Sequence, residues 1–138
     1  MRAFLASVSC LFALSGFAVE PIPPRLVGVW ATETAVLRDG FLFEGMALYL
    51  GADGTGALVF APPPIGPRIL TTFNAGTNTI VFQWTNEDGK ILGSGRMLYD
   101  PAQQTIVVEQ LPGRALHRRL DELTDPMRQA RGIELIGK

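Results

Sequence analysis

Residues 78–99 read NTIVFQWTNEDGKILGSGRMLY, and this stretch carries the clearest structural signal in the chain. Apolar and polar side chains alternate on both sides of Asn86-Glu87-Asp88-Gly89, and a period of two is typical of a β-strand with one buried face. Asn, Asp and Gly adopt positive φ at little cost, as the loop of a hairpin requires. The sequence therefore predicts two antiparallel strands, over 78–85 and 91–99, joined by a tight turn.

The same alternation continues in both directions from this hairpin. Breaks rich in Gly, Asn and Asp separate the apolar runs at 51–54 and 74–78, and Asp100-Pro101 suits a type I turn. We predict strands at residues 25–33, 41–50, 54–60, 67–73, 78–85, 91–99, 104–110 and 114–121. Eight short strands at this spacing predict an all-β protein, either an antiparallel barrel or a sandwich.

The C-terminus is the segment with a helical pattern. Asp125 is a suitable N-cap, Pro126 suits the first helical position, and Gly132 is a typical C-terminal stop. We predict a short helix here, which must pack against the sheet because a helix of this length is marginal alone.

The N-terminus has the pattern of a secretory signal peptide. Arg2 gives a positive start, residues 3–13 are apolar, and Gly16-Phe17-Ala18 places small residues before a cleavage site. Lipid attachment at Cys10 is the alternative, but Ser7-Val8-Ser9 lacks the leucine usual in lipoprotein signals. We therefore predict an exported protein, either periplasmic or secreted.

This pattern divides the chain into three parts. We predict a signal peptide over 1–18, an extended linker over 19–24 and a single domain over 25–138. The sole cysteine, Cys10, lies in the signal, so the mature protein has neither a disulfide nor a thiolate metal site.

The charge balance argues against a nucleic-acid partner. The chain has 12 Lys and Arg against 13 Asp and Glu, a formal net charge of −1, and loss of Arg2 with the signal makes it more negative. Binding to a phosphate backbone calls for a basic surface instead. We also expect no membrane span, because no segment after the signal is long and apolar enough.

Candidate catalytic groups are few. Ser94 is the only serine after the predicted signal, and it lacks the Gly-x-Ser-x-Gly elbow that exposes a nucleophile. His117 is the only histidine, so a two-histidine zinc site cannot form. Asp53-Gly54-Thr55-Gly56 reads as a hairpin turn, because it lacks the ligands of a calcium loop and the lysine of a phosphate loop. We predict that the protein is not an enzyme and binds no metal or cofactor.

Strand periodicity also assigns the side chains that face the interior. The inner face of three consecutive strands carries Ile80, Phe82, Trp84, Gly93, Gly95, Met97, Tyr99, Ile106 and Val108. Two glycines on this face either leave space inside or relieve a bend in the sheet. The predicted ligand contacts are Phe82, Trp84, Met97 and Val108 in the interior, with Phe41, Phe43 and the proline-rich loop 61–67 at the rim.

Gly28-Val29-Trp30, in the first predicted strand, resembles the Gly-x-Trp signature of lipocalins. In that family the tryptophan closes the floor of an eight-stranded antiparallel up-and-down barrel, and an arginine from the last strand lies across its ring. Arg118 shares a strand face with the apolar Leu116 and Leu120, so it is the expected partner. The resemblance implies a lipocalin-like barrel closed by Gly28, Trp30 and Arg118. The chain departs from the family in its short length, its lack of a disulfide and the absence of a recognisable helical turn before the tryptophan.

Two functions are open from the sequence. The first is an exported lipocalin-like binding protein for a small apolar ligand, because an eight-stranded barrel is just wide enough to hold one. The second is a periplasmic protein-binding module, such as an inhibitor, an immunity protein or an accessory protein. The second function predicts a filled barrel and an exposed patch at residues 41–43 with Arg38 and Asp39. The volume and lining of the interior distinguish the two.

Overall fold

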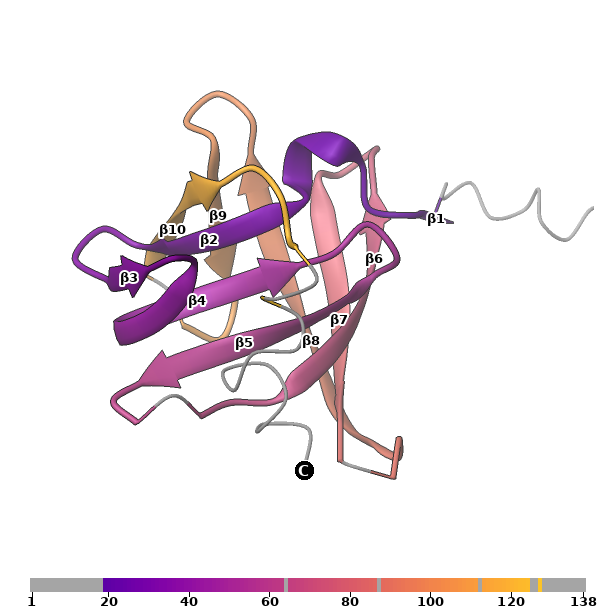
Figure 1. Cartoon of the computed structure of the whole chain (residues 1–138). Coiled ribbons are helices and arrows are strands. Elements are labelled where there is room, and N and C mark those ends of the chain that lie inside the picture. Colours follow the sequence, from indigo (N-terminus) through magenta and orange to yellow (C-terminus); the bar gives the residue numbers. More distant parts are fainter. Residues whose placement is uncertain (1–18, 64, 87, 112, 125–126, 128–138) are drawn as a thin grey trace, which may run out of the picture.

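The computed structural model describes residues 19–63, 65–86, 88–111, 113–124 and 127 (Figure 1). Within these residues the chain forms β-strands and one 3-10 turn, η1 (Pro24–Leu26). The strands are β1 (Val19–Glu20), β2 (Gly28–Thr32), β3 (Val36–Arg38), β4 (Phe41–Leu50), β5 (Thr55–Ala61), β6 (Arg68–Asn74), β7 (Thr79–Thr85), β8 (Ile91–Asp100), β9 (Thr105–Val108) and β10 (Ala115–Leu120).

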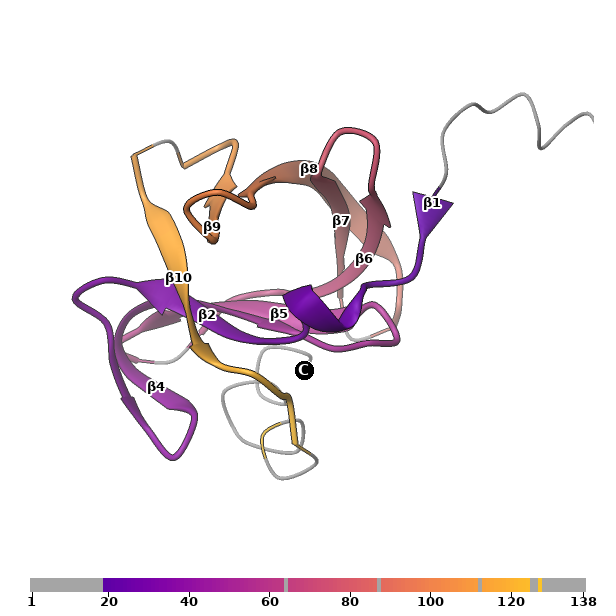
Figure 2. The ribbon, with the colours of Figure 1, turned by 90° about the horizontal axis from the view of Figure 1, so that it is seen from above.

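Eight of the strands form a closed antiparallel barrel (Figure 2). Each barrel strand pairs with the next one along the chain, from β2 with β4 to β9 with β10, and β10 returns to pair with β2. This order confirms the predicted eight-stranded antiparallel barrel. β1 pairs with the end of β6 and β3 with the start of β4. The predicted C-terminal helix falls on residues 125–132, which lie outside the described residues except for Met127.

The barrel interior is filled by one apolar cluster. Its buried members are Ile22, Leu26, Trp30, Met46, Leu48, Leu50, Leu58, Ile69, Phe73, Ile80, Phe82, Met97, Ile106, Val108 and Leu116. Trp84 and Tyr99 are partly buried and pack against this cluster. The inner face that strand periodicity predicted for β7, β8 and β9 therefore points into the barrel.

The N-terminal segment closes one end of the barrel. The residues predicted as a linker, 19–24, lie against the wall, with β1 paired to β6 and Ile22 buried. η1 follows, so the first barrel strand begins later than the sequence predicted, at Gly28. Leu26 is fully buried, and its carbonyl accepts a hydrogen bond from Trp30 Nε1 at 3.0 Å. The turn thus plugs the barrel beside the tryptophan.

A second apolar cluster lies on the outer face of β2, β4 and β5. Its buried members are Val29, Ala31, Ala35, Leu42, Ala47, Tyr49, Ala57, Val59 and Met127. At Gly45 the φ angle is +103°, and a Cβ there would come within 2.9 Å of Ala35. The first residues of β4 pair with β3, whereas the residues after Gly45 pair with β2 and β5. The β3–β4 hairpin consequently folds back over the outside of the barrel.

Tyr49 fastens this hairpin to the wall. Its hydroxyl donates a hydrogen bond to the Gly40 carbonyl at 2.7 Å and accepts one from the Leu42 amide at 3.1 Å. The side chain is 1% exposed. Burial raises the pKa of Tyr49 to about 12, because the phenolate loses its hydration, although the amide hydrogen bond from Leu42 acts in the opposite direction.

The pairing of β10 with β2 contains a bulge. Arg118 pairs with Trp30 and Leu120 pairs with Val29, so Arg119 is an extra residue in β10. The extra residue turns Leu120 toward the outer cluster. The expectation that Leu120 shares the inner face with Arg118 is therefore wrong, because strand parity fails across a bulge.

Gly28→Ala tests the close approach of β2 to β10. Gly28 has a φ of +135°, and a Cβ there would overlap the Leu120 carbonyl oxygen. We expect the substitution to lower the free energy of unfolding by more than about 2 kcal/mol, from backbone strain and the clash together. Gly89→Ala is the matched control, because Gly89 has a φ of +83° with nothing within 4 Å of its Cβ position. That variant should lose about 1 kcal/mol in urea unfolding, and equal losses in both would contradict the contact.

Tyr49→Phe tests the buried hydroxyl. At neutral pH we expect a loss of about 1–3 kcal/mol in unfolding free energy, because two buried backbone groups lose their partner. The folded-state pKa lies above the ordinary value of 10.0, so the stability that Tyr49 contributes is complete below pH 10 and is lost as the pH rises through about 12. The difference between wild type and variant should therefore shrink by on the order of 2 kcal/mol across that range. A difference that does not change with pH would refute the assignment.

Candidate functional site

The closed end of the barrel is built around Trp30. Its indole is 1% exposed, and the Arg118 Cζ lies 5.0 Å from the ring centroid. The contact between Arg118 and Trp30, expected from the family resemblance and from the alternation of side chains along the last strand, is thus present. Tyr99 meets the indole edge to face, with centroids 6.1 Å apart, and Arg118 Nη1 lies 3.2 Å from the Asp121 carboxylate. A hollow of about 330 Å³ adjoins these four residues.

The interior around the predicted ligand contacts is packed. Three of the four have side chains that are at most 3% exposed, namely Phe82, Met97 and Val108. The fourth, Trp84, is half-buried and lies against Phe82 with ring centroids 5.9 Å apart. A Cβ at Gly93 would overlap the Trp84 indole, and one at Gly95 would lie 2.7 Å from the Phe82 ring. Gly93 therefore makes room for the Trp84 ring, and Gly95 makes room for the Phe82 ring and the Gln110 side chain.

Phe41 and Phe43 lie on the β3–β4 hairpin, outside the barrel. Phe41 packs against the outer cluster. Phe43 is 48% exposed, and the Arg38 Cζ lies 4.9 Å from its ring centroid. The expectation that these residues form the rim of the interior is wrong, because β4 bends at Gly45 and carries its first half away from the barrel.

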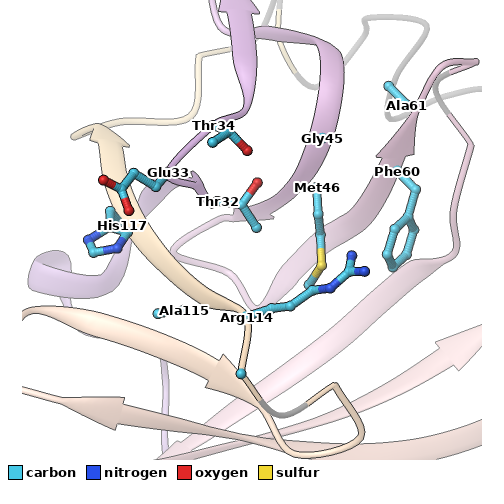
Figure 3. Close-up of a pocket in the computed structure, with 11 residues that line it drawn as sticks. Thr32, Glu33, Thr34, Gly45, Met46, Phe60, Ala61, Arg114, Ala115 and His117 are labelled. Atoms are coloured by element: carbon cyan, nitrogen blue, oxygen red, sulfur yellow. The ribbon is translucent and has the colours of Figure 1, made fainter.

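An open hollow of about 600 Å³ lies at the end of the barrel opposite η1 (Figure 3). It is bounded by the β2–β3 turn, the middle of β4 at Gly45, the end of β5 and the loop that leads into β10. Its lining residues are Thr32, Glu33, Thr34, Gly45, Met46, Phe60, Ala61, Gly113, Arg114, Ala115 and His117.

The side chains around this hollow fall into two groups. Figure 3 shows Arg114 extending beneath Met46 and toward the ring of Phe60, whereas Glu33 and His117 lie together on the other side. Met46 is 1% exposed and Phe60 is 36% exposed. The hollow therefore has an apolar wall with one guanidinium beside it, and a polar wall opposite.

The sequence prediction missed most of this site. None of the six predicted ligand-contacting side chains lines the hollow, although Ala61 of the predicted rim loop does. Strand parity places Met46 and Phe60 on the inner faces of β4 and β5, so these two could have been found. The position of Arg114 depends on the path of the loop before β10, which has no periodic signal.

The groups at this site suit reversible binding. The described residues contain no group of three or more His, Cys, Asp or Glu side chains placed to hold a metal ion. In the same part of the chain, no helix has the length and hydropathy that crossing a membrane requires. What the hollow offers is apolar contact, chiefly from Phe60, together with a charged donor from Arg114.

Comparisons of the chain with protein-family models, with curated proteins and with solved structures find no match. The geometry of the hollow and its side chains therefore carries the functional conclusion.

Arg118→Met tests the guanidinium over the indole. The Arg118 side chain is 23% exposed, so we expect a loss of about 1–2 kcal/mol in unfolding free energy when the contact is removed. Arg38→Met is the matched control, because Arg38 lies over the exposed ring of Phe43 and should lose less than about 1 kcal/mol. Both are measured by urea unfolding, and indistinguishable losses would count against a stabilising role at Trp30.

Proposed function

We propose that this protein is an exported, lipocalin-like binding protein that holds a small apolar ligand at the open end of its barrel. The observation that carries the proposal is the hollow of about 600 Å³, a size within the range of small-molecule sites. Phe60 supplies most of its accessible apolar surface, beside Met46, which is almost fully buried. Binding is an equilibrium, with no covalent step and no cofactor.

The packed interior decides where the ligand sits. Because Phe82 and Trp84 pack with the interior cluster beside Gly93 and Gly95, the ligand rests in the opening instead. Apolar contact contributes about 25 cal/mol for each Å² of surface that it buries, and part of this gain offsets the lost freedom of the ligand. We therefore expect affinities in the micromolar range or weaker.

Three further features support an exported lipocalin-like carrier. Trp30 sits under Arg118 at the closed end, in the relation that the family resemblance implies. η1 directly precedes the tryptophan strand, where lipocalins have a helical turn. The signal-peptide pattern over 1–18 supports a location in the periplasm or outside the cell.

A second function, a periplasmic protein-binding module, is favoured by two observations: the filled interior that this function predicts, and the β3–β4 hairpin. Val36 is 39% exposed and Phe43 is 48% exposed on this hairpin, which stands outside the barrel. Among the described strands β3 pairs with β4 alone, so no described strand covers its other edge. Exposed apolar side chains beside an open strand edge suit a partner that adds a strand.

Two phenylalanine variants distinguish these functions. The probe is the neutral fluorophore N-phenyl-1-naphthylamine, titrated into the mature protein. Phe60→Ser should weaken its binding at least about fivefold, because the variant removes apolar contact surface from the hollow. Phe43→Ser is the matched control, since it makes the same change on the outer hairpin and should leave probe binding unaltered.

Two results would contradict the carrier proposal, and a third would support the second function. A wild-type protein that does not bind the probe, or a Phe60→Ser variant that binds as well as wild type, overturns the carrier proposal. Retention of a defined periplasmic protein by wild type and by Phe60→Ser, with loss in Phe43→Ser, would establish the binding module instead.

A further inference from the structure

The hollow at the open end contains a cation with no ion-pair partner in the described part of the chain. The ion pairs found there join Arg96 to Glu109 and Arg118 to Asp121, and neither involves Arg114. The Arg114 amide donates a hydrogen bond to the Leu111 carbonyl at 3.4 Å, which anchors the start of β10. The backbone of Arg114 is thus placed at the opening, and its side chain is exposed there with its charge available.

A ligand that rests on the apolar wall also meets the Arg114 charge. The Arg114 side chain runs beneath Met46 toward Phe60, so a molecule resting on those two side chains also covers the guanidinium (Figure 3). Covering a charge without giving it a partner is costly, whereas a charge-assisted hydrogen bond to an anion is among the stronger polar contacts. A neutral ligand therefore loses part of its apolar gain, and an anionic ligand does not.

The opposite wall sets the orientation. Glu33 lies beside His117 across the hollow from the Arg114 guanidinium (Figure 3). A negative head group placed near Glu33 would be repelled, and one placed near Arg114 would be attracted. The two walls thus favour one direction of binding, with the head group at Arg114 and the apolar part against Met46 and Phe60.

We infer that the ligand of this site is an amphipathic anion, a single carboxylate or similar group on an apolar chain or ring, and that Arg114 determines this specificity. This inference rests on the proposed carrier function. It adds that the ligand is negatively charged and that Arg114 is the residue that recognises this charge.

The experiment compares three ten-carbon ligands that share a chain and differ in head group: decanoate, decanol and decylamine. Each displaces the neutral probe N-phenyl-1-naphthylamine from the mature protein at neutral pH and below its micelle concentration. We expect decanoate to bind at least about tenfold more tightly than decanol, which corresponds to about 1.4 kcal/mol, and decylamine to bind most weakly.

Three variants assign the effect to Arg114. Arg114→Gln should lower decanoate affinity to the decanol level while leaving decanol within about twofold of wild type, because only the ion pair is lost. Arg114→Lys should recover part of the preference for decanoate. Lysine keeps the positive charge but lacks the planar guanidinium that donates two hydrogen bonds to one carboxylate. Arg96→Gln, which makes the same charge change at the Arg96–Glu109 pair on the wall, should bind all three ligands as wild type does.

The outcomes separate this inference from the proposed function. If wild type binds decanol and decanoate equally, or if Arg114→Gln keeps the preference for decanoate, the inference is overturned and the carrier function stands. If wild type binds none of the three ligands and no probe, the carrier function itself fails. Thermal unfolding of each variant shows whether the exposed substitution has left the fold intact.

Discussion

The pairing of β10 with β2 is the constraint on which the rest of this structure depends, because it turns a row of hairpins into a closed wall. The register places Arg118 opposite Trp30, and the bulge that follows frees Arg119 from the ladder. The Arg119 guanidinium donates hydrogen bonds to the carbonyls of Thr32 and Ala35, each at 3.1 Å. One strand junction therefore both seals the tryptophan floor and holds the turn that borders the open hollow.

β10 and the residue before it place one arginine at each end of the barrel, and the two arginines have different surroundings. β10 carries Arg118 at the closed end and follows directly on Arg114 at the open end. The first guanidinium lies over an indole and contacts Asp121, so its interactions are internal. The second extends beside Met46 toward Phe60 at the open hollow, where the proposed ligand would meet it. Closure and the proposed binding site are thus separated along one short element.

Most of the barrel followed from the sequence, because period-two alternation and turn residues report on each strand and its inner face. The Trp30–Arg118 contact followed from the family resemblance and strand parity together. Local periodicity does not contain the bend at Gly45 or the bulge at Arg119, since both arise where neighbouring backbones meet. The errors at Phe41, Phe43 and Leu120 have this origin. The open hollow was missed because loops bring its walls together, and loops have no period.

The outer cluster adds a second apolar layer to one side of the barrel, whereas the other side has a single layer. β2, β4 and β5 carry apolar layers on both faces. The outer faces of β6, β7 and β8 meet solvent, with Leu70, Val81 and Leu98 between 40% and 47% exposed. Doubly packed sheet resists deformation, whereas a single layer bows more easily. Met46 and Phe60 lie on strands of the doubly packed half, so the apolar wall of the hollow is backed by a second layer that preserves its shape.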